Sequence, residues 1–163
     1  MSSDTPVPVP ESPRLHVVLY EPEIAANAGA IGRTCVAARA KLWLVRPLGF
    51  HLDDRHLRRA ALDYWQHLDL DVVDHLSEVE KALGRDRLWS FSTKSTKIYT
   101  QAAFRPGDAL VFGPESRGLP RNWIDGRPDR ALTIPIRPEA RSLNLSNAVA
   151  IALFEAIRQI GME

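Results

Sequence analysis

The chain lacks several features that define common protein classes. It has a single cysteine, Cys35, among 163 residues, so disulfides and cysteine-based metal sites are excluded within one chain. Its formal net charge of +1 is far from the strongly basic balance of proteins that grip nucleic acid over their whole surface. No run of roughly 18 apolar residues marks a membrane span, and no basic start with an apolar stretch marks a secretion signal. We therefore expect a soluble, cytoplasmic protein without a membrane partner, in which any RNA site is a local patch.

Two further absences exclude classes of cofactor. No G-x-G-x-x-G loop occurs in the chain, which argues against a nicotinamide or flavin enzyme. Cys35 stands in an Ala-rich segment, where a small buried thiol is expected. The histidines show no metal-ligand spacing, and we predict no metal; they are His16, His51, His56, His67 and His75.

Length and local composition predict one folded domain with a short tail. A chain of 163 residues is long enough for one domain with a sizeable core. Residues 1–14 contain four prolines among Ser, Asp, Thr and Glu residues, a composition that buries too little apolar surface to offset the entropy of ordering. We expect residues 1–14 to be a disordered tail and residues 15–163 to form the domain.

Short apolar segments alternate with helical patterns along the domain. We expect strands at residues 15–20, 41–45, 70–73, 88–92, 109–112 and 131–136. We expect helices at residues 27–40, 53–64 and 144–160, and a short one that Ser77 and Glu80 cap and that ends near Gly84. Gly161 stands just past the last helix, where glycine is common. Such alternation predicts an α/β fold with a mostly parallel sheet flanked by helices.

A polar loop between a strand and an apolar helix, at residues 134–148, is the most informative segment. Asn144, Ser146 and Asn147 are each able to accept a backbone N–H that the first helical turn leaves unpaired. No charged residue occurs from Ala148 to Phe154, so the helix is expected to be enclosed on nearly all sides. A polar loop held by a buried helix indicates a ligand site.

Residues 19–33 and 110–120 have the same character. In the first, Pro22 ends a strand and Asn27 is expected to cap a helix. Gly29 and Gly32 each cost about 1 kcal/mol relative to Ala inside a helix, so they need a packing or functional reason. In the second, Gly113 and Pro114 turn the chain after a strand. Glycine allows a main chain to approach a ligand, and parallel sheets bind ligands beyond the carboxyl ends of their strands.

Together these three segments resemble those of SPOUT-class RNA 2′-O-ribose methyltransferases, and the resemblance extends over residues 15–160. Residues 47–64, with Pro47-Leu48-Gly49-Phe50 and Asp53-Asp54, are similar to the family that methylates the wobble ribose of the tRNA anticodon. The resemblance implies a C-terminal trefoil knot, S-adenosylmethionine as methyl donor with S-adenosylhomocysteine as product, and a homodimer that binds the anticodon arm. The implied target is cytidine or modified uridine at tRNA position 34, in leucine isoacceptors.

The resemblance also assigns residues to the site. It implies catalytic roles for Arg33, Asn27, Glu115, Ser142 and Asn144. It implies that the cofactor is bound by Phe91, Ser92, Thr93, Gly113, Pro114, Glu115, Ile134, Ile136, Ser142, Leu143 and Asn144. The expected RNA-binding residues are Arg55, Arg58, Arg59, Lys94, Lys97 and Arg117. Each of these charges is alternatively a solvated surface residue.

Arg33 is expected to hold the 2′-oxygen or a neighbouring phosphate and to stabilise developing alkoxide charge. Guanidinium groups in proteins are effectively always protonated, which makes an arginine a poor general base. Glu115 is expected to orient Arg33 or another arginine. Two alternatives stay open: a 2′-O-methyltransferase that acts on ribosomal RNA or another tRNA position, and an RNA-binding module without activity.

Overall fold

The computed structural model describes residues 14–161, apart from the side chains of residues 61 and 62. The tail predicted for residues 1–14 therefore lies, except for Arg14, outside the described residues. Within the described chain, no helix is long and apolar enough to cross a membrane.

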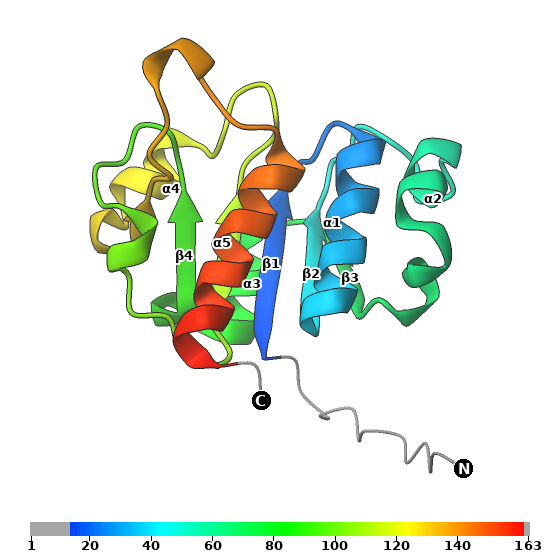
Figure 1. The fold of residues 1–163 in the computed structure, drawn as a ribbon, viewed down its shortest axis with the longest axis horizontal. Helices are drawn as coiled ribbons and strands as arrows, with labels where there is room; N and C mark the ends of the chain where they lie inside the picture. The colour runs from blue at the N-terminus through cyan, green and yellow to red at the C-terminus, as the bar shows by residue number, and fades with distance from the viewer. Residues whose placement is uncertain (1–13, 162–163) are drawn as a thin grey trace.

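Six parallel strands form one sheet in the described chain, in the order β3-β2-β1-β5-β4-β6 (Figure 1). The strands are β1 (Leu15–Tyr20), β2 (Ala40–Val45), β3 (Leu70–Val73), β4 (Leu88–Phe91), β5 (Ala109–Phe112) and β6 (Ala131–Leu132). Because all the strands are parallel, their carboxyl ends meet at one edge of the sheet. This is the edge of the arrowheads in Figure 1.

Helices cover both faces of the sheet. Helices α1 (Ala25–Ala38) and α5 (Leu145–Ile160) pack on one face, and α3 (Leu76–Leu83) and α4 (Arg121–Asp125) on the other. Helix α2 (Arg55–Ala61) and the following 3-10 segment η1 (Leu62–His67) pack against α1 rather than on the sheet. The remaining 3-10 turns are η2 (Arg85–Arg87), η3 (Tyr99–Gln101), η4 (Pro128–Arg130) and η5 (Pro138–Ala140).

Alternate residues of each central strand enter different cores. In β1, Leu15, Val17 and Leu19 pack with α1 and α5, whereas Val18 packs toward α3. Side chains of a strand alternate between the two faces, and a strand covered on both faces is apolar throughout. The predicted α/β fold with a parallel sheet is confirmed. The knot stays a prediction of the resemblance.

The predicted helix starts need three corrections. Helix α1 begins at Ala25 with Ile24 at its N-cap, so Asn27 lies inside the first turn and does not cap. In α2, Asp54 rather than Asp53 accepts the N–H of His56, at 2.7 Å. In α3, the predicted Ser77–Glu80 pair is wrong: the carboxylate of Glu78 accepts the N–H groups of Asp74 and His75, each at 2.8 Å.

The last predicted strand is also shorter than expected. Strand β6 ends at Leu132 rather than Ile136, because beyond it only a single bridge joins Thr133 to Ile98. The chain then leaves the sheet and forms the loop that leads to α5. The strands predicted at 15–20, 70–73 and 109–112 agree fully with the structure, and those predicted at 41–45 and 88–92 agree to within one residue.

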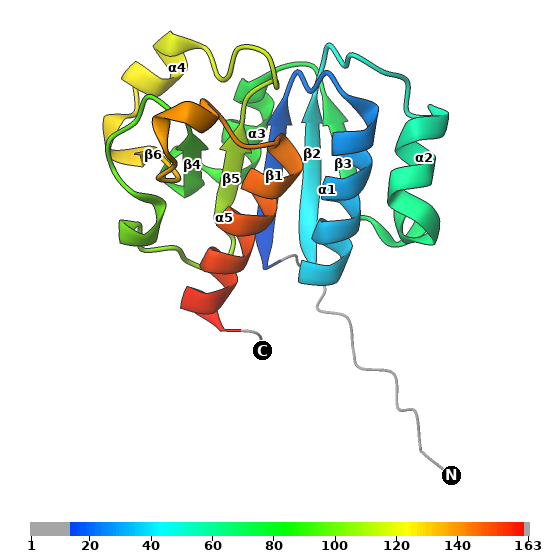
Figure 2. The same ribbon diagram turned by 45° about the horizontal axis from the view of Figure 1, so that its top comes forward.

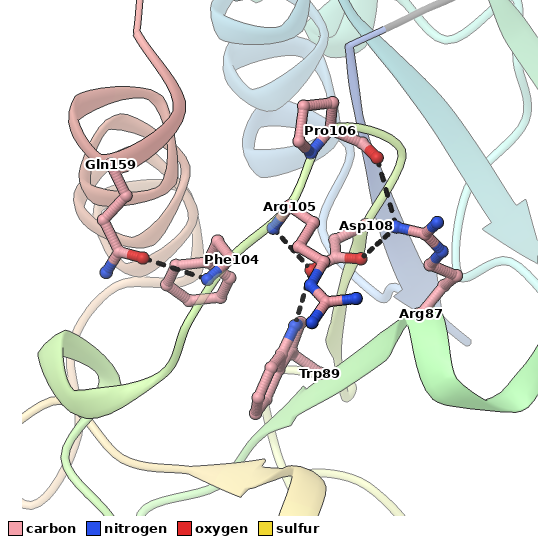
Figure 3. A network of polar contacts seen from close by, with 7 residues as sticks. All are labelled: Arg87, Trp89, Phe104, Arg105, Pro106, Asp108 and Gln159. Carbon is pink, nitrogen blue, oxygen red and sulfur yellow. Dashed lines mark hydrogen bonds and ion pairs between the residues drawn. The ribbon is translucent and has the colours of Figure 1, made fainter.

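A polar network closes the amino edge of the sheet (Figure 3). The side chain of Asp108 is 1% exposed and accepts hydrogen bonds from Trp89 Nε1 at 2.9 Å and from the Arg105 N–H at 2.9 Å. It also pairs with Arg87 at 3.3 Å. Gln159 of α5 accepts the N–H of Phe104 at 2.9 Å. These contacts tie the end of α5 and β4 to the segment that enters β5, and they leave the opposite edge to the loops.

Candidate functional site

The three sequence segments meet at the carboxyl edge of the sheet. Figure 2 shows the β1–α1 connection, α4 and the segment before α5 gathered there. They enclose a cavity of about 880 Å³, beyond the ends of β4, β5 and β6. Its volume falls in the range of small-molecule sites, roughly 300–1,000 Å³.

Glu115 joins the second segment to the first. Its Oε1 accepts the N–H of Glu23 at 3.0 Å, and its Oε2 accepts the N–H of Ile24 at 2.8 Å and the Asn27 amide at 3.3 Å. Backbone N–H groups at a helix start have no partner within the helix and favour negative charge. In the described chain, Glu115 therefore accepts from two backbone N–H groups and one side-chain amide. The expectation that it orients Arg33 or another arginine does not agree with these partners.

Asn27 and Asn144 continue this chain of contacts to the third segment. The Asn144 amide donates to Asn27 Oδ1 at 3.2 Å. Asn144 Oδ1 accepts from the Ser146 N–H at 2.9 Å and from the Asn147 N–H at 3.4 Å, so Asn144 is confirmed as the N-cap of α5. A continuous line of hydrogen bonds, Glu115–Asn27–Asn144, thus fixes the relative positions of the loops.

A second set of contacts ties the same loops at the rim. Glu23 Oε1 accepts the N–H of Ser116 at 2.9 Å and its hydroxyl at 2.6 Å. These hydrogen bonds, with a smaller contribution from the charge of Arg117, lower the pKa of Glu23. Arg117 itself forms an ion pair with Glu21. Arg117 and Glu21 are therefore paired with each other, whereas Glu23 is held by hydrogen bonds from Ser116.

Gly113 is required by the turn itself. A Cβ at this position meets the Gly118 carbon and the Leu119 nitrogen at 2.2 Å, far inside van der Waals contact. Gly118 has a φ of 71°, which favours glycine. The absent side chain of Gly113 is thus explained by close packing of the turn on its own backbone. The sequence interpretation had assigned it to ligand approach.

All of the residues that the resemblance assigns to the cofactor line this cavity. They are Phe91, Ser92, Thr93, Gly113, Pro114, Glu115, Ile134, Ile136, Ser142, Leu143 and Asn144. Phe91 and Phe112 stack at the ends of their strands, with ring centroids 4.7 Å apart. Cofactor binding by these residues stays a prediction, but a common cavity is a necessary condition for it.

The sequence interpretation missed one wall of the cavity. Arg121, Ile124 and Asp125 of α4 line it, together with Leu119. A five-residue helix shows less than two turns of periodicity, so no apolar pattern marked it in the sequence. A proline before the segment, Pro120, is the only local signal that a helix begins here.

Arg33 lies outside the cavity lining. It is exposed on α1, and its guanidinium carbon lies 5.0 Å from the centre of the Tyr64 ring. The neighbouring Gly32 packs on the same segment, because a Cβ there meets Trp65 Cζ3 at 2.9 Å. Close packing of α1 on η1 therefore supplies the reason for this glycine and orients the face that carries Arg33.

The predicted RNA-binding residues divide into two groups. Lys94 and Arg117 line the cavity. Arg55, Arg58 and Arg59 are exposed on α2 and lie outside the cavity lining. Lys97 also lies outside it, with its Nζ 5.4 Å from the centre of the Trp89 ring.

Neither Cys35 nor His16 lines the cavity. Within residues 14–161, no three or more His, Cys, Asp or Glu side chains come close enough to hold a metal ion. Cys35 is buried, as predicted, and burial raises the pKa of its thiol. His16 is buried in β1, away from the carboxyl edge, and burial lowers its pKa to about 4.

Comparison with known proteins gives consistent relatives. Residues 14–154 match the SpoU rRNA Methylase family. The tRNA (cytidine(34)-2'-O)-methyltransferase of Saccharophagus degradans is 46% identical over 151 residues, which are 90% of this chain and 96% of that protein. A structure described as giving insights into the 2-OH methylation of C/U34 on tRNA is 48% identical, with a TM-score of 0.84, and covers 89% of this chain and 95% of that one.

A more distant structure shows the shared fold. The SpoU methyltransferase AviRb from Streptomyces viridochromogenes, in complex with the cofactor AdoMet, has a TM-score of 0.79 at 24% identity. The match covers 93% of this chain and 60% of that one.

Proposed function

The chain belongs to the SpoU rRNA Methylase family, and we propose that it transfers a methyl group from S-adenosylmethionine to the ribose 2′-hydroxyl of nucleotide 34 in tRNA. The observation that carries the proposal is the cavity where the three segments meet, held by the Glu115–Asn27–Asn144 hydrogen bonds. Relatives that cover nearly the whole chain and are named for this reaction support the choice of nucleotide.

The cavity suits a nucleoside that carries a short charged chain. Ile134, Ile136 and Leu143 supply apolar lining, and Ser92, Ser142 and Asn144 supply polar lining. When bound, S-adenosylmethionine supplies an electrophilic methyl group on a sulfonium. Calorimetric titration should show one site per chain, abolished by Ile136→Glu and retained by Arg137→Glu, whose exposed side chain lies outside the cavity lining.

The protein contributes positioning and charge. Ser142 and Asn144 lie where the third segment enters the cavity, and we assign them to contacts with cofactor and ribose. Holding the 2′-oxygen in line with the methyl group removes much of the entropic barrier. Arg33 stabilises the negative charge that develops on that oxygen or holds a neighbouring phosphate.

The active unit in this proposal is a homodimer. Arg33 and the arginines of α2 lie outside the cavity lining of their own chain. In a dimer, these arginines of one subunit act on RNA that is bound at the cavity of the other subunit. The enclosure expected for residues 148–154 is incomplete in the described chain: Ile151 and Phe154 of α5 are 39% and 45% exposed. They form an apolar surface that a second copy is able to cover. Sedimentation should show a dimer for the parent chain and a monomer for Phe154→Glu.

Position 34 and the tRNA species are tested together. We propose cytidine or modified uridine of leucine isoacceptors as the target. Mass spectrometry of tRNA from a source strain that lacks the gene should show loss of 2′-O-methylation at position 34. The parent gene should restore it, and Arg33→Ala should not, although cofactor affinity stays within a few-fold.

Other outcomes of this experiment identify the alternatives. Loss of a methyl group from ribosomal RNA, or from another tRNA position, would assign the enzyme to that target. An unchanged methylation pattern would favour an RNA-binding module without activity.

A further inference from the structure

A second pocket lies at the same edge of the sheet, beyond the ends of β1, β2 and β3. It has a volume of about 500 Å³, and no residue of its lining belongs to the larger cavity. Helix α4 separates the two spaces. Its residues Ile124 and Asp125 line the larger cavity, whereas Asn122 and Trp123 line the second pocket.

Two aromatic side chains, Tyr20 and Trp123, line the second pocket. Trp123 is fixed from two directions. Its Nε1 donates to Ser90 Oγ at 2.9 Å, and the guanidinium carbon of Arg127 lies 3.4 Å from the centre of its ring. Planar ligands stack on aromatic side chains and on guanidinium planes with little loss of side-chain entropy when those groups are already ordered.

The charged groups of the pocket are already paired. Arg46 pairs with Asp74 at 3.2 Å, Arg127 pairs with Glu80, and Glu21 pairs with Arg117. Both arginines of the described lining are therefore paired, and neither is left to bind a phosphate group. The chemistry favours a neutral ligand.

Polar groups in the pocket remain available. Asn122 and Ser77 present an exposed amide and an exposed hydroxyl from different elements, α4 and α3. Together, the aromatic walls and these groups match a flat molecule with donors and acceptors along its edge.

We propose that this pocket binds a nucleobase of the RNA that neighbours the methylated nucleotide. The proposal rests on the proposed function, because only an RNA substrate brings such a base beside the larger cavity. Single-stranded loops are recognised by bases splayed onto aromatic side chains and hydrogen-bonded along their edges. The ends of β1 and β5 are adjacent, so the two spaces lie side by side at the edge where a bound loop must pass.

A double-mutant cycle tests the proposal. The protein variant is Ser77→Ala with Asn122→Ala, which removes edge contacts and leaves Trp123 and Arg127 in place. The RNA variants are anticodon stem-loops in which one nucleotide on either side of position 34 is made abasic. Gln101→Ala is the control, since Gln101 is an exposed amide outside both linings. Equilibrium binding is measured for each pair with the full chain and saturating cofactor.

We expect one abasic position at which the parent loses roughly tenfold in affinity, because the stacking and the edge contacts of the base are lost together. At that position the double variant should lose less than the parent does, because its edge contacts are already gone and only the stacking remains to be lost. The control should lose as much as the parent.

Two results overturn the pocket assignment. If the losses multiply at every position, no base interacts with Ser77 and Asn122, although normal methylation of the intact stem-loop would leave the proposed function standing. If the parent binds cofactor but neither binds nor methylates the intact stem-loop, the proposed function fails and the pocket proposal falls with it.

Discussion

At each edge of the sheet a carboxylate accepts several hydrogen bonds from neighbouring segments, but one edge is closely packed and the other contains a cavity. At the amino edge, the side chain of Asp108 is 1% exposed and accepts hydrogen bonds from Trp89 Nε1 and the Arg105 N–H. At the carboxyl edge, Glu115 accepts from Glu23, Ile24 and Asn27, but the loops that it joins surround a cavity of about 880 Å³. The first network completes the packing of the fold, and the second fixes the loops in place around the cavity.

This difference follows from what each carboxylate joins. Asp108 ties segments that already lie in the core or at its border, so its hydrogen bonds complete the packing. Glu115 ties the start of α1 to the turn after β5, and both lie beyond the strand ends. Perturbing the carboxyl edge should therefore change activity more than stability, and perturbing the amino edge should do the reverse.

The largest effect is expected for Glu115→Ala. It removes the acceptor of three N–H donors and frees the loops to move. Small displacements of a reacting group cost roughly 100-fold in rate, so methyl transfer should fall at least that far. Stability should fall by only about 1–3 kcal/mol. Single-turnover assays and urea unfolding measure the two quantities, with the exposed Glu139→Ala as control. A variant with parent-like turnover would show that this network is not needed to position the site.

Asp108→Ala should give the converse pattern. The variant leaves the buried Trp89 Nε1 and the Arg105 N–H without their acceptor and removes the partner of Arg87. We expect a loss of about 3 kcal/mol in the free energy of unfolding. Turnover at temperatures well below the transition should stay within a few-fold of the parent. Asp86→Ala, which removes an exposed carboxylate, is the control. An Asp108→Ala protein as stable as its control would contradict the assigned role.

The sequence predicted the carboxyl edge better than the amino edge. Strand ends followed by Gly, Pro, Asn and Ser are local signals, and they marked the three segments, whose family resemblance implied the cavity-lining residues. Asn144 was one of three candidates for the N-cap of the last helix, and the structure selects it. Asp108 had no such signal. It stands beside Gly107, where an aspartate looks like an ordinary turn residue, and its partner Trp89 lies 19 residues away.

Long-range contacts also explain the errors at the carboxyl edge. Asn27 was predicted to cap the helix because asparagine is common at that position. Its actual partner, Glu115, lies 88 residues later, and no local pattern indicates that contact. Once a distant carboxylate caps α1, Asn27 is free to bridge to Asn144. The second pocket was missed for a similar reason, because its lining comes from β1, the ends of β2 and β3, and the segment around α4.

A third prediction tests whether RNA binding extends beyond the carboxyl edge. Arg58 and Arg59 are exposed on α2 and lie outside the cavity lining. If they contact phosphates, the Arg58→Ala, Arg59→Ala double variant should bind tRNA more weakly. Its salt dependence should be flatter by roughly one slope unit per lost contact. Cofactor affinity should not change. Parent-like tRNA binding across a salt series would identify this face as solvated surface and direct the RNA path over Lys94, Lys97 and Arg117.

The smallest effect concerns the amino edge and pH. His16 lies in β1, where its backbone N–H donates to the carbonyl of Asp108. Its ring Nδ1 accepts a hydrogen bond from Trp43 Nε1 at 3.0 Å. Burial, reinforced by the charge of Lys41 and opposed by Asp69, lowers the pKa of His16 from 6.5 to about 4. The unfolded chain therefore binds this proton at a higher pH than the folded chain does. Stability contributed by neutral His16 is present above pH 6.5 and is lost as the pH falls toward about 4.

His16→Asn isolates this contribution. An Asn side chain retains an acceptor for Trp43 near the position of Nδ1 but does not titrate. Urea unfolding at several pH values between 4 and 6.5 should show a stability slope in the parent that exceeds the variant's by up to about 1.4 kcal/mol per pH unit. The carboxylates shared by both proteins cancel in the difference. Equal slopes would mean that His16 takes up its proton in the folded state as readily as in the unfolded chain, and the amino edge would then be less closed than its network indicates.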